Sequence, residues 1–561
     1  MRNHWLQVRN SLRHEHLSWS KNGSVRLSRC LPALTLTLAL SLGVSGALTG
    51  CSGTKETDST QVSGAPTAGD SGNGSQTGAP PGGSGKPGDA VIGQQPSGRP
   101  EGSGQVQPPS VSPDGEDEAE TGKPQDPLPE TIPAFPGEGQ EEEGASGGPG
   151  VDEEEAYQWE NRAIIATDIH YLSRELTDGG SGFQYMVEHG DGKVVTYIEP
   201  ITDAFLEEVI RERPDVLILS GDLTLDGEKK SHEELAGKLY QVEEAGIPVV
   251  VIPGNHDINN HHAAQYKGED RFPAEFTTPE EFREIYRDFG YDEAISRDRT
   301  SLSYVYELDA DNRLLMLDTC QYKKKALVGG AILSDTYDWI QAQLEDAWDC
   351  GMNVIPVAHH NLLDESEIYV DDCTIEHGEQ LVQMLEEWDV PLFLSGHLHV
   401  QHTKRSGGNK GVWEMVTSSL ATPACQYGRL DFWDDGSFVY ETCTVDVEGW
   451  ARRQGRKEIE LLEFEAFKEP FLRRVFYNQS NDVLEKNPDI TGPERERMSR
   501  LYSELNYHYY QGTAYLIKEE TLKNPDYKLW MNDGFFTVLS DYVQYIVEDA
   551  EGDYNKVEMR K

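Results

Sequence analysis

Five short motifs rich in aspartate, histidine and asparagine are the residues most able to do chemistry in this 561-residue chain. In chain order they are Asp168-Ile169-His170, Gly221-Asp222, Gly254-Asn255-His256-Asp257, His359-His360-Asn361 and Gly396-His397-Leu398-His399. Carboxylate, imidazole and amide groups bind divalent cations, and the motifs contain no thiolate. Such ligands suit Mn, Fe or Zn, whereas Cu(I) and iron–sulfur clusters need softer ones.

Each motif directly follows a short apolar run with the composition of a buried strand. The runs cover residues 163–167, 216–219, 249–252, 354–357 and 392–394, and a further run at 314–317 precedes no motif. Helices are predicted at about 203–212, 229–244, 280–289, 336–348 and 378–387. This alternation indicates an α/β fold with a largely parallel sheet, in which ligands bind beyond the carboxyl ends of the strands. We therefore expect all five motifs to meet at one edge of one sheet.

The order of the motifs carries more information than any single motif. A lone D-x-H or His-His is more often a helix cap or a hydrogen-bonded buried pair than a metal site. The set D-x-H, G-D, G-N-H-D, His-His and G-H-x-H resembles that of the calcineurin-like metallophosphoesterase family. The resemblance covers about residues 161–447. It implies a four-layered α/β/β/α sandwich and a centre with two divalent metal ions.

The resemblance also implies the metal ligands, carried over residue by residue. The first ion would be held by Asp168, His170, His399 and the bridging Asp222. The second ion would share Asp222 and add Asn255, His359 and His397. Because two histidines follow the same strand, His360 stays an alternative to His359.

Phosphoester hydrolysis is the activity that the resemblance implies. Two metals about 3.5–4 Å apart stabilise the attacking and leaving oxygens of an in-line displacement and make hydroxide available near neutral pH. Metal-bound hydroxide would attack phosphorus, with phosphodiesters favoured over phosphomonoesters. His256 would donate a proton or contact the phosphate, and Asp257 would orient His256; the alternative for Asp257 is a cap of the next segment. A non-catalytic envelope-binding protein on the same scaffold is the rival function, which the loss of a metal ligand would mark.

Three other features predict structure. The polar stretch from Asn259 to Thr278 should form part of a pocket wall, where His261 and His262 either contact substrate or stay exposed. The turn Asp434-Asp435-Gly436 predicts a hairpin of a second sheet within residues 413–447. Five cysteines follow residue 51 without a C-x-x-C spacing, so no zinc ribbon is expected and one or two disulfides remain open.

The N-terminal part has the composition of an export signal and a linker. Residues 1–51 end in an uncharged run and in Leu48-Thr49-Gly50-Cys51, which resembles a bacterial lipobox. We expect a lipoprotein signal peptide with a lipid anchor on Cys51, and an uncleaved transmembrane anchor is the alternative. Residues 52–156 are expected to be a disordered linker, because Ser52 to Glu155 hold 22 Gly and 15 Pro. Either way the folded part is extracytoplasmic and attached to the cell membrane.

The charge of the chain limits its partners. The 98 acidic residues outnumber the 49 Lys+Arg, for a net charge of −49, which argues against a surface that binds nucleic-acid phosphates. The expected partners are therefore a phosphoester substrate, either a small molecule or an envelope component, and the membrane.

The last 114 residues lie beyond the family motifs, and their structure is predicted separately. A metallophosphoesterase domain at 157–447 should be followed by a helical C-terminal domain at 448–561, in which 18 residues are aromatic. Thr491-Gly492-Pro493-Glu494 predicts a capping box before one amphipathic helix, and a second apolar run spans 535–546. This domain either covers a sheet face or overhangs the metal site, where Tyr507, Tyr509 and Tyr510 would narrow access.

Overall fold

The computed structural model describes residues 160–561 except 324–325, 367, 369, 409, 533 and 538. The predicted signal segment with Cys51 and the predicted linker at 52–156 lie outside these residues. Among the described helices, none has the length and apolar character needed to cross a membrane.

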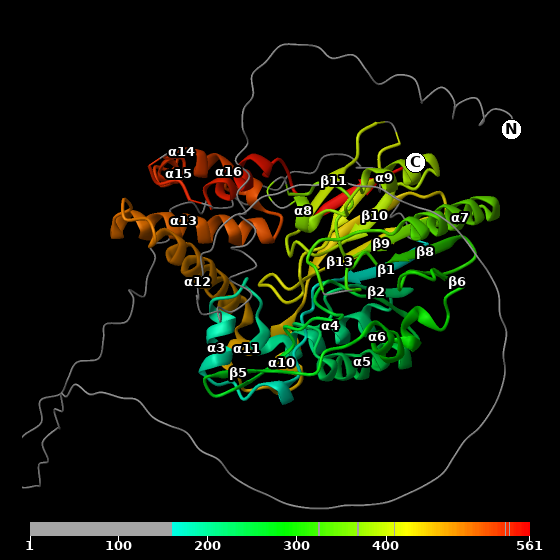
Figure 1. Ribbon diagram of the computed structural model, residues 1–561, viewed down its shortest axis with the longest axis horizontal. Helices are drawn as coiled ribbons and strands as arrows, with labels where there is room; N and C mark the ends of the chain where they lie inside the picture. Colours follow the sequence, from blue (N-terminus) through cyan, green and yellow to red (C-terminus); the bar gives the residue numbers. More distant parts are fainter. Residues whose placement is uncertain are drawn as a thin grey trace, which may run out of the picture. The chain divides into compact units, whose positions relative to one another are not determined.

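Two β-sheets packed against each other form the centre of the described chain (Figure 1). The first sheet has the strand order β15 (Lys556–Met559), β14 (Phe438–Thr444), β13 (Gln426–Phe432), β1 (Asn161–Ala166), β2 (Val216–Ser220) and β3 (Val249–Ile252). The second has the order β11 (His402–Arg405), β12 (Trp413–Val416), β10 (Leu392–Ser395), β9 (Asn353–Ala358), β8 (Asn312–Leu317), β7 (Tyr304–Glu307) and β6 (Ser296–Arg297). The strands β1 to β3 run parallel, and so do β8, β9, β10 and β12.

Successive side chains of β8 pack in two different layers of the sandwich. Leu314 and Met316 belong to the core shared with the first sheet, whereas Leu315 and Leu317 pack with α7 (Ser334–Cys350) and α9 (Glu379–Glu387). Successive side chains of a strand point to opposite faces, so an unbroken apolar run is what a strand covered on both faces requires.

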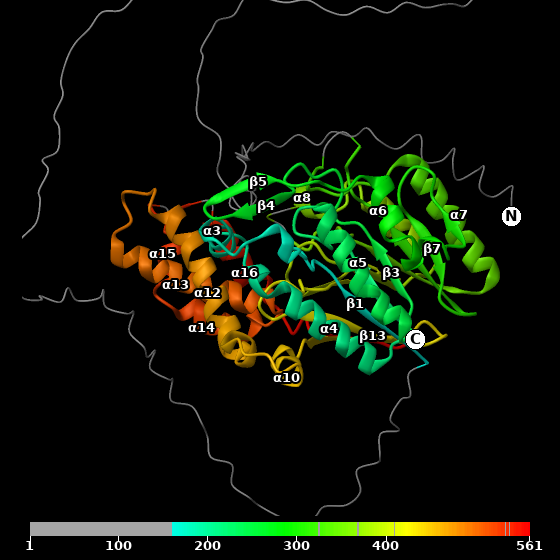
Figure 2. The ribbon, with the colours of Figure 1, turned by 90° about the horizontal axis from the view of Figure 1, so that it is seen from below.

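Helices complete the two outer layers. The outer face of the first sheet is covered by α4 (Ile198–Glu212) and α5 (Lys229–Glu244), with α6 (Pro279–Ile285) beside them (Figure 2). The helices α7 and α9 cover the second sheet. The four-layered α/β/β/α sandwich expected from the sequence is confirmed.

The single sheet expected from the sequence is wrong. The first three motifs follow strands of one sheet, and the last two follow β9 and β10 of the other. The predicted hairpin at Asp434-Asp435-Gly436 exists, but β13 pairs antiparallel with β1, so the hairpin extends the first sheet. An apolar run predicts a buried strand, but the run has the same pattern in either sheet and does not indicate which sheet the strand joins.

One helix of the structure is shorter than the sequence predicts. The helix expected at 280–289 ends at Ile285 and is followed by a π-helical turn, η3 (Arg287–Tyr291). Gly290 has a φ of +93°, and a Cβ there would lie 2.6 Å from the Tyr304 hydroxyl oxygen. The chain turns at the one residue that allows both the dihedral and the close approach.

Smaller elements frame the edge of the sandwich where the motifs lie. They are η1 (Arg174–Leu176), α3 (Ser181–Glu188), η2 (Val195–Tyr197), β4 (Ala264–Lys267), β5 (Asp270–Pro273) and α8 (Val370–Cys373). The stretch predicted to form a pocket wall contains the hairpin β4–β5. The five cysteines of the described chain are all free thiols.

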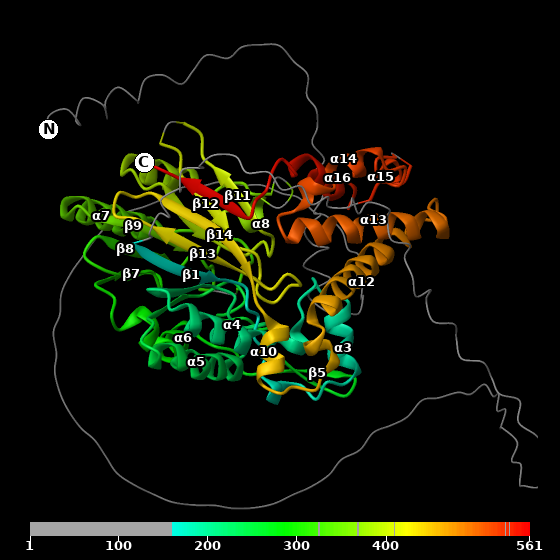
Figure 3. The same ribbon diagram turned by 180° about the vertical axis from the view of Figure 1, so that it is seen from behind.

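The C-terminal residues form helices that pack partly on the core of the sandwich and partly around a second core. The helices are α10 (Val447–Arg453), α11 (Ile459–Leu462), α12 (Phe464–Leu484), α13 (Gly492–Tyr510), η4 (Ala514–Leu516), α14 (Lys518–Lys523), α15 (Tyr527–Trp530) and α16 (Ser540–Asp549). The capping box at Thr491 and Glu494 is present, whereas the second helix begins at Ser540, later than its apolar run. The chain then returns to the sandwich, where β15 pairs with β14 (Figure 3).

Candidate metal centre

The backbone at the motif residues is held in an unusual conformation. Asp168, His170, Asp222, His397 and His399 have φ angles between 47° and 72°, in the left-handed region. Non-glycine residues there cost free energy, of order 1–3 kcal/mol each in sparsely populated regions, and persist only when the surroundings enforce them. The fold therefore holds these side chains in place against a local preference.

Glycines before the ligand positions let the strand ends approach closely. A Cβ at Gly221 would lie 2.7 Å from Nδ1 of His359. A Cβ at Gly396 would collide with the Thr167 hydroxyl, and one at Gly254 with the backbone nitrogen of Asp222. The glycine in each of these motifs thus makes room for a neighbouring motif.

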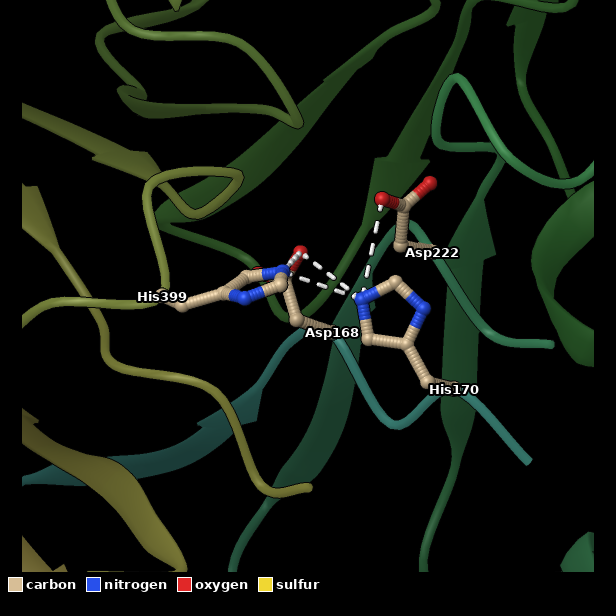
Figure 4. A group of neighbouring side chains, drawn as sticks. All are labelled: Asp168, His170, Asp222 and His399. Atoms are coloured by element: carbon tan, nitrogen blue, oxygen red, sulfur yellow. Dashed lines mark hydrogen bonds and ion pairs between the residues drawn. The ribbon is translucent and has the colours of Figure 1, made fainter. Parts of the chain in front are cut away.

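The first cluster joins four buried side chains from three strand ends (Figure 4). The Nε2 atoms of His170 and His399 lie 3.0 Å apart. Oδ1 of Asp168 lies 3.7 Å from Nε2 of His170 and 3.3 Å from Nε2 of His399. Oδ2 of Asp222 lies 3.9 Å from Nε2 of His170. Two carboxylates and two imidazoles converge on one point.

The second cluster shares Asp222 with the first. Nε2 of His359 lies 3.3 Å from Oδ2 of Asp222 and 3.1 Å from Oδ1 of Asn255. Nδ1 of His397 lies 3.1 Å from the same Nε2. His360 faces away, because its Nδ1 lies 2.7 Å from the Thr319 hydroxyl oxygen and its Nε2 donates to a backbone carbonyl.

Hydrogen bonds outside the clusters decide which ring nitrogen faces inward. Nδ1 of His359 donates to the Ser220 carbonyl at 2.9 Å, so Nε2 faces the cluster. Nε2 of His397 donates to the Asp372 carbonyl at 2.9 Å, so Nδ1 faces inward. Backbone carbonyls behind metal-binding histidines commonly fix the tautomer in this way.

These residues fit two divalent cations. Within the described chain, the buried Oδ1 of Asp168 has no hydrogen-bond partner, although Oδ2 accepts from the Thr167 hydroxyl and from the His397 amide. Burial and the nearby Lys193 charge hold the pKa of His170 well below its usual value, so its imidazole is neutral, as a ligand must be. Burial would raise the pKa of Asp222, but the charges of His359 and His256 hold it well below the usual range.

His256 lies beside the clusters with its own set of partners. Its ring centroid is 5.1 Å from that of His170, at 88°. Its Nδ1 donates to the Leu225 carbonyl at 2.8 Å and lies 3.1 Å from Oδ1 of Asp226. Burial lowers the pKa of His256, but Asp222 and Asp226 outweigh burial and raise it to about 9.

Asp257 does not orient His256, so that prediction is wrong. Its carboxylate accepts hydrogen bonds from the amides of Gly254, Leu223 and Thr224 at 2.8, 3.0 and 3.0 Å and from the Thr224 hydroxyl at 3.0 Å. Three convergent amide donors draw this carboxylate toward the loop after β2, and Asp226 takes the place beside His256.

Sequence reasoning missed two further residues of this site, because neither belongs to a motif. Lys193, 6% exposed, lies in the loop after α3, and its Nζ is 2.8 Å from Oδ2 of Asp191. The same oxygen lies 3.9 Å from Nδ1 of His399. Burial would raise the pKa of Asp191, but Lys193 and His399 lower it to about 2. An ion pair with a buried ammonium group thus lies beside the candidate ligand His399.

A cavity of about 710 Å³ opens above the clusters, and we call it the aromatic cavity. Asp222, Asn255, His256, His397 and His399 line its floor, and His261 and His262 line its rim. The C-terminal helices supply its aromatic wall, which consists of Phe476, Tyr502, Tyr509, Tyr510 and Tyr542. Both roles predicted for these helices have support in the structure. Helices α12, α13 and α16 overhang the motifs. Helices α10, α11 and part of α12 also pack on the core of the sandwich, to which they add Val447, Trp450, Ala451, Leu461, Phe464, Phe471 and Val475. Tyr507 takes no part in the wall and packs under the Arg473 guanidinium, 4.9 Å from its ring centroid.

Two family models and several known proteins are similar to this chain. Residues 162–401 match the family model of calcineurin-like phosphoesterases, and residues 446–553 match that of the C-terminal domain of cyclic nucleotide phosphodiesterase. A probable cyclic nucleotide phosphodiesterase from a Synechococcus species is 27% identical over 261 residues, which are 44% of this chain and 84% of the relative. A probable glycerophosphodiester phosphodiesterase from Arcobacter nitrofigilis is 24% identical over 283 residues, 49% of this chain and 86% of the relative. A solved dimetal phosphatase from Danio rerio aligns with 51% of this chain and 99% of its own, at 11% identity and a TM-score of 0.38.

Proposed function

We propose that the substrates of this chain, which belongs to the calcineurin-like metallophosphoesterases, are phosphodiesters that carry a nucleoside. The proposal starts from its activity as a metal-dependent phosphodiesterase. The observation that carries this proposal is the aromatic cavity, which joins two clusters of metal-ligating side chains to a wall of five aromatic rings. A non-catalytic scaffold would not need both clusters complete.

The proposed ligand set follows the two clusters. The first ion would be held by Asp168, His170, Asp222 and His399. The second ion would be held by Asp222, Asn255, His359 and His397. The contacts of His360 with Thr319 and a backbone carbonyl support His359 as the ligand of the pair. The mixed oxygen and nitrogen donors suit Mn, Fe or Zn.

The chemistry divides between the ions and the chain. When bound, two divalent ions lower the pKa of water and take up negative charge on phosphoryl oxygens. Asp222 and the imidazoles would hold the ions. His256, with Nδ1 donating to the Leu225 carbonyl, has Nε2 available to protonate the departing oxygen. Asp226 positions His256 through the same ring nitrogen.

The aromatic wall distinguishes two substrate classes suggested by the relatives. A glycerophosphodiester offers no ring to stack, whereas a nucleoside base stacks on aromatic side chains with about 1–3 kcal/mol per base. Phe476 and Tyr510 lie with ring centroids 5.0 Å apart in this wall. A wall built from rings favours the nucleoside.

A substrate panel tests this proposal. We expect thymidine 5′-(p-nitrophenyl) phosphate to be hydrolysed with a kcat/KM at least about tenfold above that of p-nitrophenyl phosphate and of glycerophosphocholine. A higher kcat/KM for the monoester, or for glycerophosphocholine, would reject the proposed substrate class.

The location of the protein is a further part of the proposal. The lipobox-like Leu48-Thr49-Gly50-Cys51 supports a signal peptide at 1–51, a lipid on Cys51 and an extracytoplasmic enzyme at the cell membrane. The linker at 52–156 would then separate the membrane from a catalytic domain at 157–447 and a C-terminal domain at 448–561. A coil of about 100 residues spans about 55 Å.

Cys51→Ser tests the anchor. We expect the variant to be released from the membrane or to accumulate as a longer precursor that incorporates no labelled fatty acid. A variant processed and anchored like the wild type would show that Cys51 carries no lipid.

A further inference from the structure

A second cavity, of about 630 Å³, meets the aromatic cavity beside the candidate metal centre. The two cavities share four lining residues: Asp191, Lys193, Asp226 and His256. The remaining walls of the second cavity come mainly from α3, with the loop that follows it, and from the hairpin β4–β5, and Val195 and Leu225 complete them. Those of the aromatic cavity include the C-terminal helices. The site therefore has two lobes with a common junction.

The walls of the second cavity are fixed to each other. The α3 helix and the hairpin lie side by side (Figure 2), and the amide of Gly182 donates to the Gly268 carbonyl at 2.9 Å. A Cβ at Gly182 would lie 2.7 Å from the Glu269 carbonyl oxygen, so only glycine allows this approach. Phe183 packs against Tyr266 with centroids 5.7 Å apart. Because backbone contacts hold the two walls together, this cavity is a built part of the fold.

The lining of the second cavity offers surface to an organic group. Tyr185 is 63% exposed and stacks on His189, with centroids 4.1 Å apart and planes at 18°. Met186 and Tyr266 add apolar surface. Aromatic faces held in place by a neighbouring ring bind planar groups at a low cost in conformational entropy.

The junction carries the groups that an anion would meet. The Lys193 ammonium is buried, and its partner Asp191 lies 3.9 Å from His399 of the first cluster. His256 stands at the same junction, with Asp226 between it and Arg271, whose Nη2 is 3.9 Å from Oδ2 of Asp226. The three cationic side chains Lys193, His256 and Arg271 lie against only two carboxylates, Asp191 and Asp226, so a phosphate at the junction would meet a local excess of positive charge.

We propose that the second cavity binds the second organic group of an acyclic phosphodiester. The nucleoside lies against the aromatic wall, the phosphate lies at the junction by Lys193 and His256, and the other alcohol lies between α3 and the hairpin β4–β5. Hydrolysis breaks one P–O bond, adds the oxygen of water to phosphorus and gives one proton to the departing oxygen, so each cavity holds one product. A cyclic nucleotide or a monoester fills the aromatic cavity alone. This inference rests on the proposed phosphodiesterase activity.

A pair of substrates with the same nucleoside tests the inference. The acyclic substrate is thymidine 5′-(p-nitrophenyl) phosphate, and the cyclic one is thymidine 3′,5′-cyclic phosphate. Met186→Trp fills the second cavity, and Tyr185→Ala removes its exposed ring. We expect each variant to lower the ratio of kcat/KM for the acyclic over the cyclic substrate about tenfold, through KM of the acyclic one. Tyr240→Phe is the matched control, because Tyr240 bonds Asp288 away from both cavities and should leave the ratio unchanged.

The outcomes separate the inference from the function on which it rests. If Tyr185→Ala and a folded Met186→Trp both keep the wild-type ratio while both diesters are hydrolysed, the second cavity does not bind substrate. If Met186→Trp does not fold, the ratio measured for Tyr185→Ala decides alone. If the wild type hydrolyses neither diester, the proposed function fails and this inference falls with it.

Discussion

The Nε2 atoms of His170 and His399 face each other at 3.0 Å, although 229 residues separate them in the chain. Both residues adopt left-handed backbone angles, and the buried Nδ1 of His170 has no hydrogen-bond partner in the described chain that would fix the tautomer of its ring. A cation bound by both Nε2 atoms would use the two rings as ligands. The relationship therefore indicates a site organised for a metal ion before the ion binds.

Asp222→Asn is the sharpest change at this site, because Asp222 is common to both clusters. The variant keeps the shape of the side chain and removes its charge. We predict loss of at least one bound metal ion per chain and a fall in kcat/KM of at least about a hundredfold, with the thermal unfolding transition retained. Asp298→Asn is the matched control, since Asp298 accepts from the Thr336 hydroxyl outside the site and should keep its metal. Wild-type turnover with a full metal content in Asp222→Asn would refute the assignment.

His256→Ala should separate proton donation from metal binding. We predict that the variant keeps its metal and loses rate by about 10²–10⁴-fold on esters with poor leaving groups, with a smaller loss on p-nitrophenyl esters. Asp226→Asn should show the same pattern more weakly, because Asp226 holds His256 through Nδ1. A loss that is equal for good and poor leaving groups would assign His256 to substrate positioning instead.

Asp257→Ala should behave as a stability variant. It leaves three buried amides and the Thr224 hydroxyl without their acceptor. Chemical denaturation should show a free energy of unfolding lower by about 3 kcal/mol, while the ratio of rates on good and poor leaving groups stays the same. Unchanged stability with an altered leaving-group dependence would restore a catalytic role to Asp257.

The sequence predicted the parts of the site that local patterns encode. Apolar runs located β1, β2, β3, β9 and β10, and the polar residues after them proved to be close in space. The division into two sheets was missed, because strands of either sheet have both faces buried and read alike. Asp226 and Lys193 were missed because their positions depend on how two loops fold over the strand ends, and no residue spacing encodes that.

A buried polar group joins the sandwich to the C-terminal helices and gives stability a pH dependence. His402 of β11 contacts Glu365 through Nδ1 and lies 3.1 Å from Oδ2 of Asp549 through Nε2. Tyr554 packs on its ring, and the Tyr545 hydroxyl donates to the Glu365 carbonyl at 2.6 Å. The buried Glu414 completes this group, and burial together with Glu365 raises its pKa well above the usual range.

Stability should fall as the pH rises past neutrality because His402 loses its proton. Burial lowers the pKa of His402, but Glu365 and Asp549 outweigh burial and raise the pKa to about 10. The unfolded value is about 6.5, so this contribution is complete below pH 6.5 and is lost as the pH rises through 10, by at most about 1.4 kcal/mol per pH unit. Denaturation between pH 6 and pH 10 should show a steeper decline for the wild type than for His402→Gln. Parallel curves for the two proteins would contradict this account.

The most direct test of the central claim is a metal titration of the metal-free protein, made with Mn²⁺, Fe²⁺ and Zn²⁺ in turn, while hydrolysis of bis(p-nitrophenyl) phosphate is followed. Two clusters that share Asp222 predict no turnover without metal and, for at least one of these ions, a rise to a plateau at two ions per chain. Full turnover in the metal-free protein, or a plateau at a single ion, would contradict the two-metal phosphodiesterase.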